Sequence, residues 1–235
     1  MTRTLSVKNI YSQRFTTLEM GGDYEESFGH PSDSGIWLIY GKEKNGKSTF
    51  ALQLAKYLSK MKKTLYVSAE EGVELEFTRA CSRAGISPAD RNLHFIDYEP
   101  LEELRKRLAK KKSARIVFID NITIYNDELK GGELRALQRD FPNKLFVFIA
   151  HEDDNGGTPA TSSGKLCKKL AKIICRVEGL AAQISGRCPG GTVVINERNA
   201  KLYYGNSVNG NEDEEGAAYA EETGETDGET ERAEA

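Results

Sequence analysis

Short apolar runs alternate with segments of helical periodicity between residues 36 and 150. The apolar runs predict buried strands, because each has roughly four to eight residues and ends at turn-forming residues. The helical segments place apolar side chains three or four positions apart, as Ala51, Leu54 and Leu58 do. The expected strands are 36–40, 64–68, 93–96, 115–120 and 145–150, and the expected helices are 49–60, 73–84, 101–112 and 133–140. This alternation predicts a mostly parallel sheet that is covered by helices on both faces.

The pattern changes after residue 171, where apolar runs follow one another without helices between them. These runs are 173–177, 181–184, 192–196 and 201–204, and glycine-rich turns join them. Successive strands with short turns predict antiparallel hairpins at one edge of the sheet. The expected fold class is therefore α/β, with three layers and a mostly parallel central sheet that ends in antiparallel hairpins.

Charge divides the chain into two unequal parts. The formal net charge is −3, but residues 211–235 hold 11 acidic residues and one arginine, a net charge of −10. Residues 1–210 therefore hold 32 basic and 25 acidic residues, a net charge of +7. We expect a lead-in over 1–34, one α/β domain over 35–205 and a disordered acidic tail over 206–235, because the tail has too few apolar residues to form a core.

Composition and residue spacing argue against several classes of protein. No run of about 18 apolar residues occurs, so we expect no membrane span. The first residues lack the apolar core of a signal peptide. The four cysteines, Cys81, Cys167, Cys175 and Cys188, have neither the C-x-x-C spacing nor the spacing of a zinc site. Reduced thiols and a cytoplasmic location are therefore expected.

The strongest motif is the octapeptide Gly-Lys-Glu-Lys-Asn-Gly-Lys-Ser at 41–48, called the phosphate loop below, which fits the pattern G-x-x-x-x-G-K-[ST]. Gly41 and Gly46 allow backbone N–H groups to face an anion, and the following helix adds the positive end of its dipole. Lys47 is expected to reach the phosphates of ATP, and the Ser48 hydroxyl to ligate Mg²⁺. The expected nucleotide-binding residues are Gly41, Lys42, Glu43, Lys44, Asn45, Gly46, Lys47, Ser48 and Thr49.

Carboxylates follow two of the expected strands. Asp120 ends an apolar strand, and ligands of open parallel sheets bind beyond the carboxyl ends of the strands. We therefore expect Asp120 to join Ser48 in holding the Mg²⁺. Glu70 and Glu71 follow another strand at the same edge, and we favour Glu70 as the base that polarises a water, with Glu71 as the spare. A solvated acidic loop that caps the next helix is the alternative.

His151 follows the expected strand 145–150. Its side chain is expected either to touch the γ-phosphate and report its loss, or simply to begin a loop, and the two interpretations have equal weight. With Lys47 and Glu70, it completes the expected catalytic set. Residues 152–164 are rich in Gly, Thr and Ser and predict a mobile loop. This loop either responds to a ligand by contacting DNA or a neighbouring subunit, or is an ordinary flexible connection.

Six cations lie among the eight residues 105–112, at the end of an expected helix. Because they precede the strand that ends at Asp120, we expect them at the edge of the sheet opposite the nucleotide. They also suit the negative end of a helix dipole. Three interpretations stay open, namely contact with a phosphate backbone, docking of the acidic tail, and a solvated helix face.

The order of these segments resembles that of the RecA superfamily, and most closely its RadA/Sms and DnaB-helicase-like branch. The matching segments are 41–48, 66–71, 116–120, 148–151 with the glycine-rich loop after it, and 176–179. The resemblance extends over roughly residues 35–205 and implies a RecA-like ATPase core that hydrolyses ATP with Mg²⁺, with Glu70 as the base. It also implies rings or filaments in which a basic residue of the neighbour completes the site. Arg187, Arg198 and Lys201 are the candidates for that residue.

Two hypotheses for the function follow from the resemblance and the charge. The leading one is an ATP-hydrolysing oligomer that acts on DNA, with single-stranded DNA favoured, in recombination, repair or replication. Its motive is the net charge of +7 outside the tail. The alternative is a nucleotide-gated adaptor with little turnover, in which bound ATP orders residues 152–164 and recruits a protein partner. In that case the acidic tail is either the element that meets the partner or an element that mimics DNA.

Overall fold

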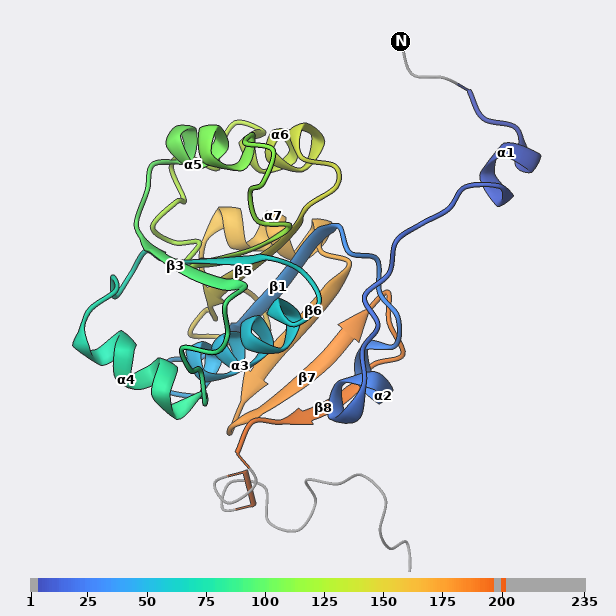
Figure 1. The fold of residues 1–235 in the computed structure, drawn as a ribbon. Coiled ribbons are helices and arrows are strands. Elements are labelled where there is room, and N and C mark those ends of the chain that lie inside the picture. Colours follow the sequence, from blue (N-terminus) through green and yellow to red (C-terminus); the bar gives the residue numbers. More distant parts are fainter. Residues whose placement is uncertain (1–3, 197–199, 202–235) are drawn as a thin grey trace, which may run out of the picture.

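An eight-stranded sheet runs through the centre of the computed structural model, which describes residues 4–196, 200 and 201 (Figure 1). The strands are β1 (Gly35–Gly41), β2 (Thr64–Ser68), β3 (Leu93–Asp97), β4 (Ile116–Asp120), β5 (Leu145–His151), β6 (Ile173–Glu178), β7 (Ala181–Gly186) and β8 (Gly191–Val194). Their order is β3-β2-β4-β5-β1-β6-β7-β8. Strands β1 to β6 run parallel, and β7 and β8 extend the sheet in antiparallel fashion. The expected α/β class is confirmed, including the antiparallel strands at one edge.

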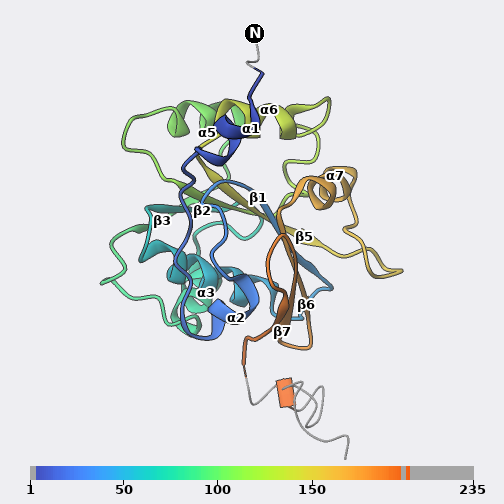
Figure 2. The same ribbon diagram turned by 90° about the vertical axis from the view of Figure 1, so that its right-hand side faces the viewer.

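Helices cover both faces of this sheet (Figures 1 and 2). One face carries α3 (Lys47–Ser59) and α4 (Leu75–Arg83), and the other carries α5 (Leu101–Leu108), α6 (Glu133–Asp140) and α7 (Ser162–Leu170). Three short elements precede β1, namely α1 (Val7–Tyr11), η1 (Gly22–Tyr24) and α2 (Glu25–Phe28). The described part of the chain therefore forms the three layers expected from the sequence.

The central strand β1 shows why the strands are continuous apolar runs. It is buried over its full length, because helices cover both of its faces. Trp37 and Ile39 belong to the apolar cluster under α3, and Ile36 and Leu38 belong to the cluster under α5. Successive side chains of a strand point to opposite faces, so a shift of one residue would exchange the two clusters.

The helix expected over 101–112 is shorter in the structure. It ends at Leu108, where the Ser113 hydroxyl donates a hydrogen bond to the Leu108 carbonyl oxygen (2.7 Å) and closes a turn. The apolar periodicity of this helix also ends at Leu108, so only the run of cations suggested a longer one. The three lysines 110–112 consequently lie in the turn rather than on the helix.

The loop expected over 152–164 also ends early, because α7 begins at Ser162. The Thr161 side chain accepts a hydrogen bond from the Gly164 N–H (3.1 Å) and caps this helix. The expected strand 201–204 lies outside the described residues apart from its first position. The other expected strands and helices begin and end within two residues of the observed bounds.

The lead-in expected over 1–34 contributes to the core from residue 18 onward. Leu18, Met20 and Phe28 are buried on the face that carries α3. The Phe28 ring lies 5.5 Å from the Trp37 ring of β1, measured between centroids. None of the residues of α1 is buried, and Figure 1 shows this helix away from the sheet.

The sequence predicts no membrane span and reduced cysteines. Within the ranges that the structure describes, no helix combines the length and the apolar character needed to cross a bilayer. All four cysteines are free thiols, and Cys167 and Cys175 are buried. Burial raises the pKa of both buried thiols, so they act as small apolar side chains in the core.

Gly41 provides a test of how closely the phosphate loop packs on the domain. A Cβ atom at Gly41 would overlap the Val177 carbonyl oxygen of β6, a main-chain atom that cannot rotate away. We expect Gly41→Ala to lower the free energy of unfolding by about 1–3 kcal/mol in chemical denaturation. Gly21→Ala is the control, because a Cβ there meets only the Tyr57 hydroxyl at 3.8 Å. Equal losses in the two variants would contradict this contact.

Candidate functional site

The carboxyl ends of four parallel strands meet at one edge of the sheet. Gly41 at the end of β1 lies opposite His151 of β5, and Asp120 of β4 lies opposite Ile149 of β5 and Ser68 of β2. The segments that follow these strands therefore surround one cavity of about 240 Å³. This volume is below the range of roughly 300–1,000 Å³ for sites that enclose drug-sized ligands. It suits a phosphate group with its metal ion rather than a whole nucleotide.

The structure brings most of the expected site residues to this cavity. It is lined by Glu43, Lys44, Lys47, Ser48, Glu70, Asp120 and His151. Glu71, which was expected only as a spare for Glu70, also lines the cavity. Asn121 and Ile149 line it as well and were not expected from the sequence. Asn121 had a usable signal, since it is a polar residue directly after a strand that ends in a carboxylate. The cavity lining does not include Gly41, Lys42, Asn45, Gly46 and Thr49.

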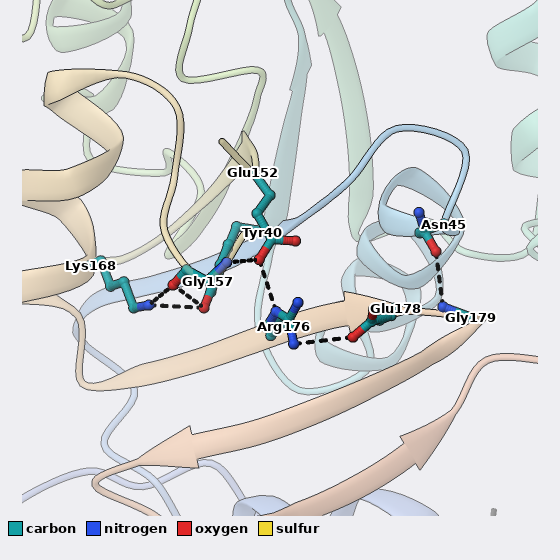
Figure 3. A network of polar contacts seen from close by, with 8 residues as sticks. All are labelled: Tyr40, Asn45, Glu152, Gly157, Lys168, Arg176, Glu178 and Gly179. Atoms are coloured by element: carbon teal, nitrogen blue, oxygen red, sulfur yellow. Dashed lines mark hydrogen bonds and ion pairs between the residues drawn. The ribbon is translucent and has the colours of Figure 1, made fainter. Parts of the chain in front are cut away.

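The phosphate-loop residues outside the lining have structural contacts of their own. The Asn45 side-chain oxygen accepts a hydrogen bond from the Gly179 N–H (3.0 Å), as Figure 3 shows, and its carbonyl accepts one from the Leu180 N–H (3.3 Å). Gly46 has a φ of +97°, and a Cβ there would lie 2.5 Å from the Leu180 side chain. The loop is therefore held against the turn between β6 and β7.

Lys47 is the one cation of the lining that is buried. Its ammonium group donates a hydrogen bond to the Lys42 carbonyl oxygen (2.7 Å), which places it across the curl of the loop. Burial lowers the pKa of Lys47, and the negative charges of Asp120, Glu43 and Glu70 act in the opposite direction. An ammonium group in this position faces the space where a bound phosphate would lie.

Asp120 is held by a buried tyrosine. The Tyr66 hydroxyl donates a hydrogen bond to the Asp120 carboxylate (2.6 Å). Burial raises the pKa of Asp120 to about 6, against the lowering effect of this hydrogen bond, and the charges of Glu70 and Glu71 add to the rise. A divalent cation would relieve the crowding of these three carboxylates.

The donor set fits Mg²⁺ in its usual protein environment. Ser48 and Asp120 offer hard oxygen atoms, which Mg²⁺ prefers. Among the described residues, no group of three or more His, Cys, Asp or Glu side chains is arranged to hold a metal ion. Mg²⁺ commonly takes only one or two ligands from the protein and the rest from phosphates and water. The residues present therefore fit this ion together with a nucleotide.

Glu70 lies beside two further polar side chains. Its side chain is 47% exposed, and its carboxylate accepts a hydrogen bond from the Asn121 amide (3.0 Å). The His151 Nε2 atom lies 3.4 Å from the same oxygen, and the His151 Nδ1 atom is buried without a hydrogen bond. Helix α4 begins five residues later, at Leu75, and has Glu74 at its N-cap. Glu70 is thus turned toward the cavity and does not cap that helix.

A second polar cluster adjoins the phosphate loop and was missed from the sequence (Figure 3). The Glu152 N–H donates to the Gly41 carbonyl oxygen (3.0 Å). The Glu152 carboxylate is 1% exposed and accepts hydrogen bonds from Arg176 Nε (2.9 Å) and from the Gly157 N–H (2.5 Å). Arg176 also pairs with Glu178 (3.1 Å). The signal in the sequence was Arg176, a charge between the apolar residues Cys175 and Val177 of a strand.

Lys168 of α7 links Gly157, in the middle of the loop over 152–161, to Tyr40 of β1. Its ammonium group donates to the Tyr40 hydroxyl (2.9 Å) and to the Gly157 carbonyl oxygen (2.5 Å), and it lies 4.7 Å from the centre of the Tyr40 ring. The Tyr40 hydroxyl donates to the Gly157 carbonyl oxygen as well (3.2 Å). The loop over 152–161 is therefore anchored next to the phosphate loop on one side and to α7 on the other.

Comparisons with known proteins identify the fold. No protein-family model and no curated protein matches the sequence. The crystal structure of the flagellar accessory protein FlaH from Methanocaldococcus jannaschii matches with a TM-score of 0.55 and 17% sequence identity, over 76% of this chain and 91% of that chain. The chain therefore has a RecA-like α/β fold, with a mostly parallel central sheet and antiparallel strands at one edge.

This similarity is one of the fold alone. In total, 505 chains of solved structures match, so the fold by itself does not define an activity. The comparisons do not distinguish the RadA/Sms and DnaB-helicase-like branch that the sequence resembles. They also give no support to the expected role on DNA.

The hydrogen bond between Tyr66 and Asp120 can be tested with a matched pair of tyrosines. Tyr66 and Tyr125 are both fully buried, and the Tyr125 hydroxyl donates to the Glu99 carbonyl oxygen (2.6 Å), away from the cavity. We expect Tyr66→Phe and Tyr125→Phe each to lower the free energy of unfolding by about 1–2 kcal/mol. Only Tyr66→Phe should also weaken the Mg²⁺-dependent binding of ATP in calorimetry, and an equal loss of binding in Tyr125→Phe would contradict the role of Asp120.

Proposed function

We propose that this chain binds ATP with Mg²⁺ at the phosphate loop and acts as a nucleotide-gated adaptor with little turnover. The observation that carries the proposal is the physical link between the phosphate loop and the loop over 152–161. Glu152 bonds the main chain of Gly41 and, through a buried carboxylate, holds Gly157 and Arg176. A change at the phosphate loop therefore has a short path to a surface loop.

The residues around the cavity support the nucleotide part of the proposal. Lys47 and the main-chain N–H groups of the loop bind and orient the phosphates, and Ser48 and Asp120 hold the metal ion. Bound Mg²⁺ neutralises phosphate charge and sets the geometry of the phosphate oxygens. Tyr66 keeps the Asp120 carboxylate in place for this task.

The gate consists of His151 and the loop that follows it. His151 lines the cavity with its Nε2 atom 3.4 Å from the Glu70 carboxylate, so a phosphate oxygen that enters the cavity can compete with Glu70 for this nitrogen. Glu152 is the next residue and holds the loop. The loop over 152–161 would exchange between two arrangements, and a ligand favours one of them only by binding it better than the other. The contact between the phosphate and His151 supplies this difference in binding.

A protein partner fits this device better than DNA does. One solved structure that shares the fold is named as an accessory protein of a flagellum. That name supports action through an assembly of proteins, to which this chain would contribute a nucleotide-dependent surface. Assembly of the chain with itself into rings or filaments is part of the same proposal, since the RecA-like resemblance implies it.

Hydrogen exchange with and without MgATP tests the gate. We expect ATP to slow amide exchange over residues 153–158 in the native chain. Lys47→Ala should weaken ATP binding by about tenfold or more and abolish this protection, because it removes a charged phosphate donor. Lys60→Ala is the control, since Lys60 is exposed at the far end of α3. Tight ATP binding with unchanged exchange over 153–158 would contradict the gate while leaving the nucleotide site intact.

Hydrolysis is the second candidate function, and the position of Glu70 favours it. Its carboxylate lies in the same cavity as Lys47 and is held by Asn121. A general base contributes roughly 100-fold or more to the rate. Under the adaptor proposal we expect phosphate release by the native chain to be close to zero and Glu70→Gln to leave it unchanged.

The neighbouring carboxylate provides the matched control, Glu71→Gln, for the same steady-state assay. A loss of about 100-fold in Glu70→Gln but not in Glu71→Gln would establish hydrolysis with Glu70 as the base. Stimulation of phosphate release by added single-stranded DNA would instead support an ATP-hydrolysing oligomer that acts on DNA.

A further inference from the structure

A second cavity lies at the opposite edge of the sheet from the phosphate loop. Its volume is about 460 Å³, within the range of ligand sites. It lies between β3, the end of α5 and the turn that precedes β4. β3 is the terminal strand of the sheet (Figure 1), and its residues His94, Phe95 and Ile96 line this cavity. Nothing in the proposed nucleotide site uses it.

The floor of this cavity is apolar and its rim is cationic. Leu65, Phe95 and Leu108 contribute to the floor, and Lys63, Lys110 and Lys112 contribute to the rim. We call this site the basic groove. Apolar side chains exclude water beneath the rim, which strengthens the attraction of the rim for a negative charge. Such a groove suits a ligand that combines an apolar centre with carboxylates on both sides.

The lysines of the basic groove form no ion pair with a carboxylate among the described residues. Arg107, the remaining cation of the lining, is held by two bonds of 2.8 Å to Glu99. Lys63 donates only to the main-chain oxygen of Lys112 (3.1 Å). The hydrogen bonds from Arg107 lower the pKa of Glu99, and the charge of Lys110 adds to this effect, but neither Lys110 nor Lys112 forms an ion pair with a described carboxylate. The three rim lysines therefore carry charge that a partner can neutralise.

We propose that residues 212–222 of this same chain bind the basic groove. This segment has the sequence Glu-Asp-Glu-Glu-Gly-Ala-Ala-Tyr-Ala-Glu-Glu. An apolar centre that contains Tyr219 lies between four carboxylates on one side and two on the other. The centre matches the apolar floor, and the flanking carboxylates match the lysines of the rim. Residues 221–231 also hold six carboxylates without a cation, but they contain no apolar side chain that could match the floor.

The length of chain allows this contact. About 18 residues separate Lys201 from Tyr219, and this length spans up to roughly 60 Å when extended. A domain of about 200 residues has a radius of gyration of roughly 16 Å, so its far side is within reach. The net charge of −10 over 211–235 also opposes the +7 of the rest of the chain.

Zero-length crosslinking of the full chain with a carbodiimide tests the proposal, because this reagent joins a lysine to a carboxylate only when the two are in contact. We expect links from residues 212–222 to Lys63, Lys110 and Lys112. Their yield should exceed that to Lys169, an exposed lysine on α7, by about fivefold or more. Raising the salt from about 0.05 M to about 0.5 M should remove most of this excess, because salt screens exposed charges.

Two variants sharpen the test. The double variant Lys110→Gln/Lys112→Gln should reduce the remaining links to Lys63 by about threefold or more, because the rim charge falls. The variant Lys169→Gln is the matched control and should leave them unchanged. Both change exposed side chains, so folding is preserved.

Three outcomes would overturn the proposal. The first is a set of links spread over all exposed lysines in proportion to their exposure. The second, from a mixture of isotopically heavy and light chains, is links between chains only, which would assign the segment to a second copy. The third is the absence of links together with protection of the rim lysines by added single-stranded DNA, which would assign the basic groove to nucleic acid. None of these outcomes depends on ATP binding.

Discussion

The packing of the phosphate loop against the turn between β6 and β7 is the contact on which the candidate site depends. Gly41 lies against the Val177 carbonyl oxygen and Gly46 against the Leu180 side chain, so neither position has room for a Cβ atom. Any side chain there would push the loop away from the turn. Because this loop orients Lys47, residues more than a hundred positions further along the chain determine where phosphate can bind.

The same region contains the charge that is most costly to bury. A carboxylate without partners is strongly unfavourable in the interior, and Glu152 gains its partners from Arg176 and the Gly157 main chain. These polar contacts, rather than apolar packing, hold the loop over 152–161, most of which is exposed or half-buried. Most residues between these anchors lack buried apolar contacts, and such segments open locally at a small cost in free energy. This property is what a gate requires.

The two edges of the sheet carry different sets of charged side chains and serve different proposed partners. Glu70, Glu71 and Asp120 lie at the carboxyl edge. There the positive charge of a bound Mg²⁺ would offset the negative charges of these carboxylates and of the phosphate. The rim lysines of the basic groove lie at the opposite edge with an apolar floor beneath them. The separation follows from the parallel arrangement, in which all strand ends of one kind lie on one side. Each site can therefore be altered without disturbing the other.

The sequence by itself determined the α/β class, the phosphate loop and the shared edge of Asp120, Glu70 and His151. These features are local, because apolar runs predict strands and parallel strands bring their carboxyl ends together. Only the tertiary structure decided that Tyr66 holds Asp120, 54 residues away, and that a buried Glu152 meets Arg176. Those contacts depend on which strands are neighbours in the sheet. Periodicity along the chain records which face of a strand is buried and contains no information about the neighbour that covers it.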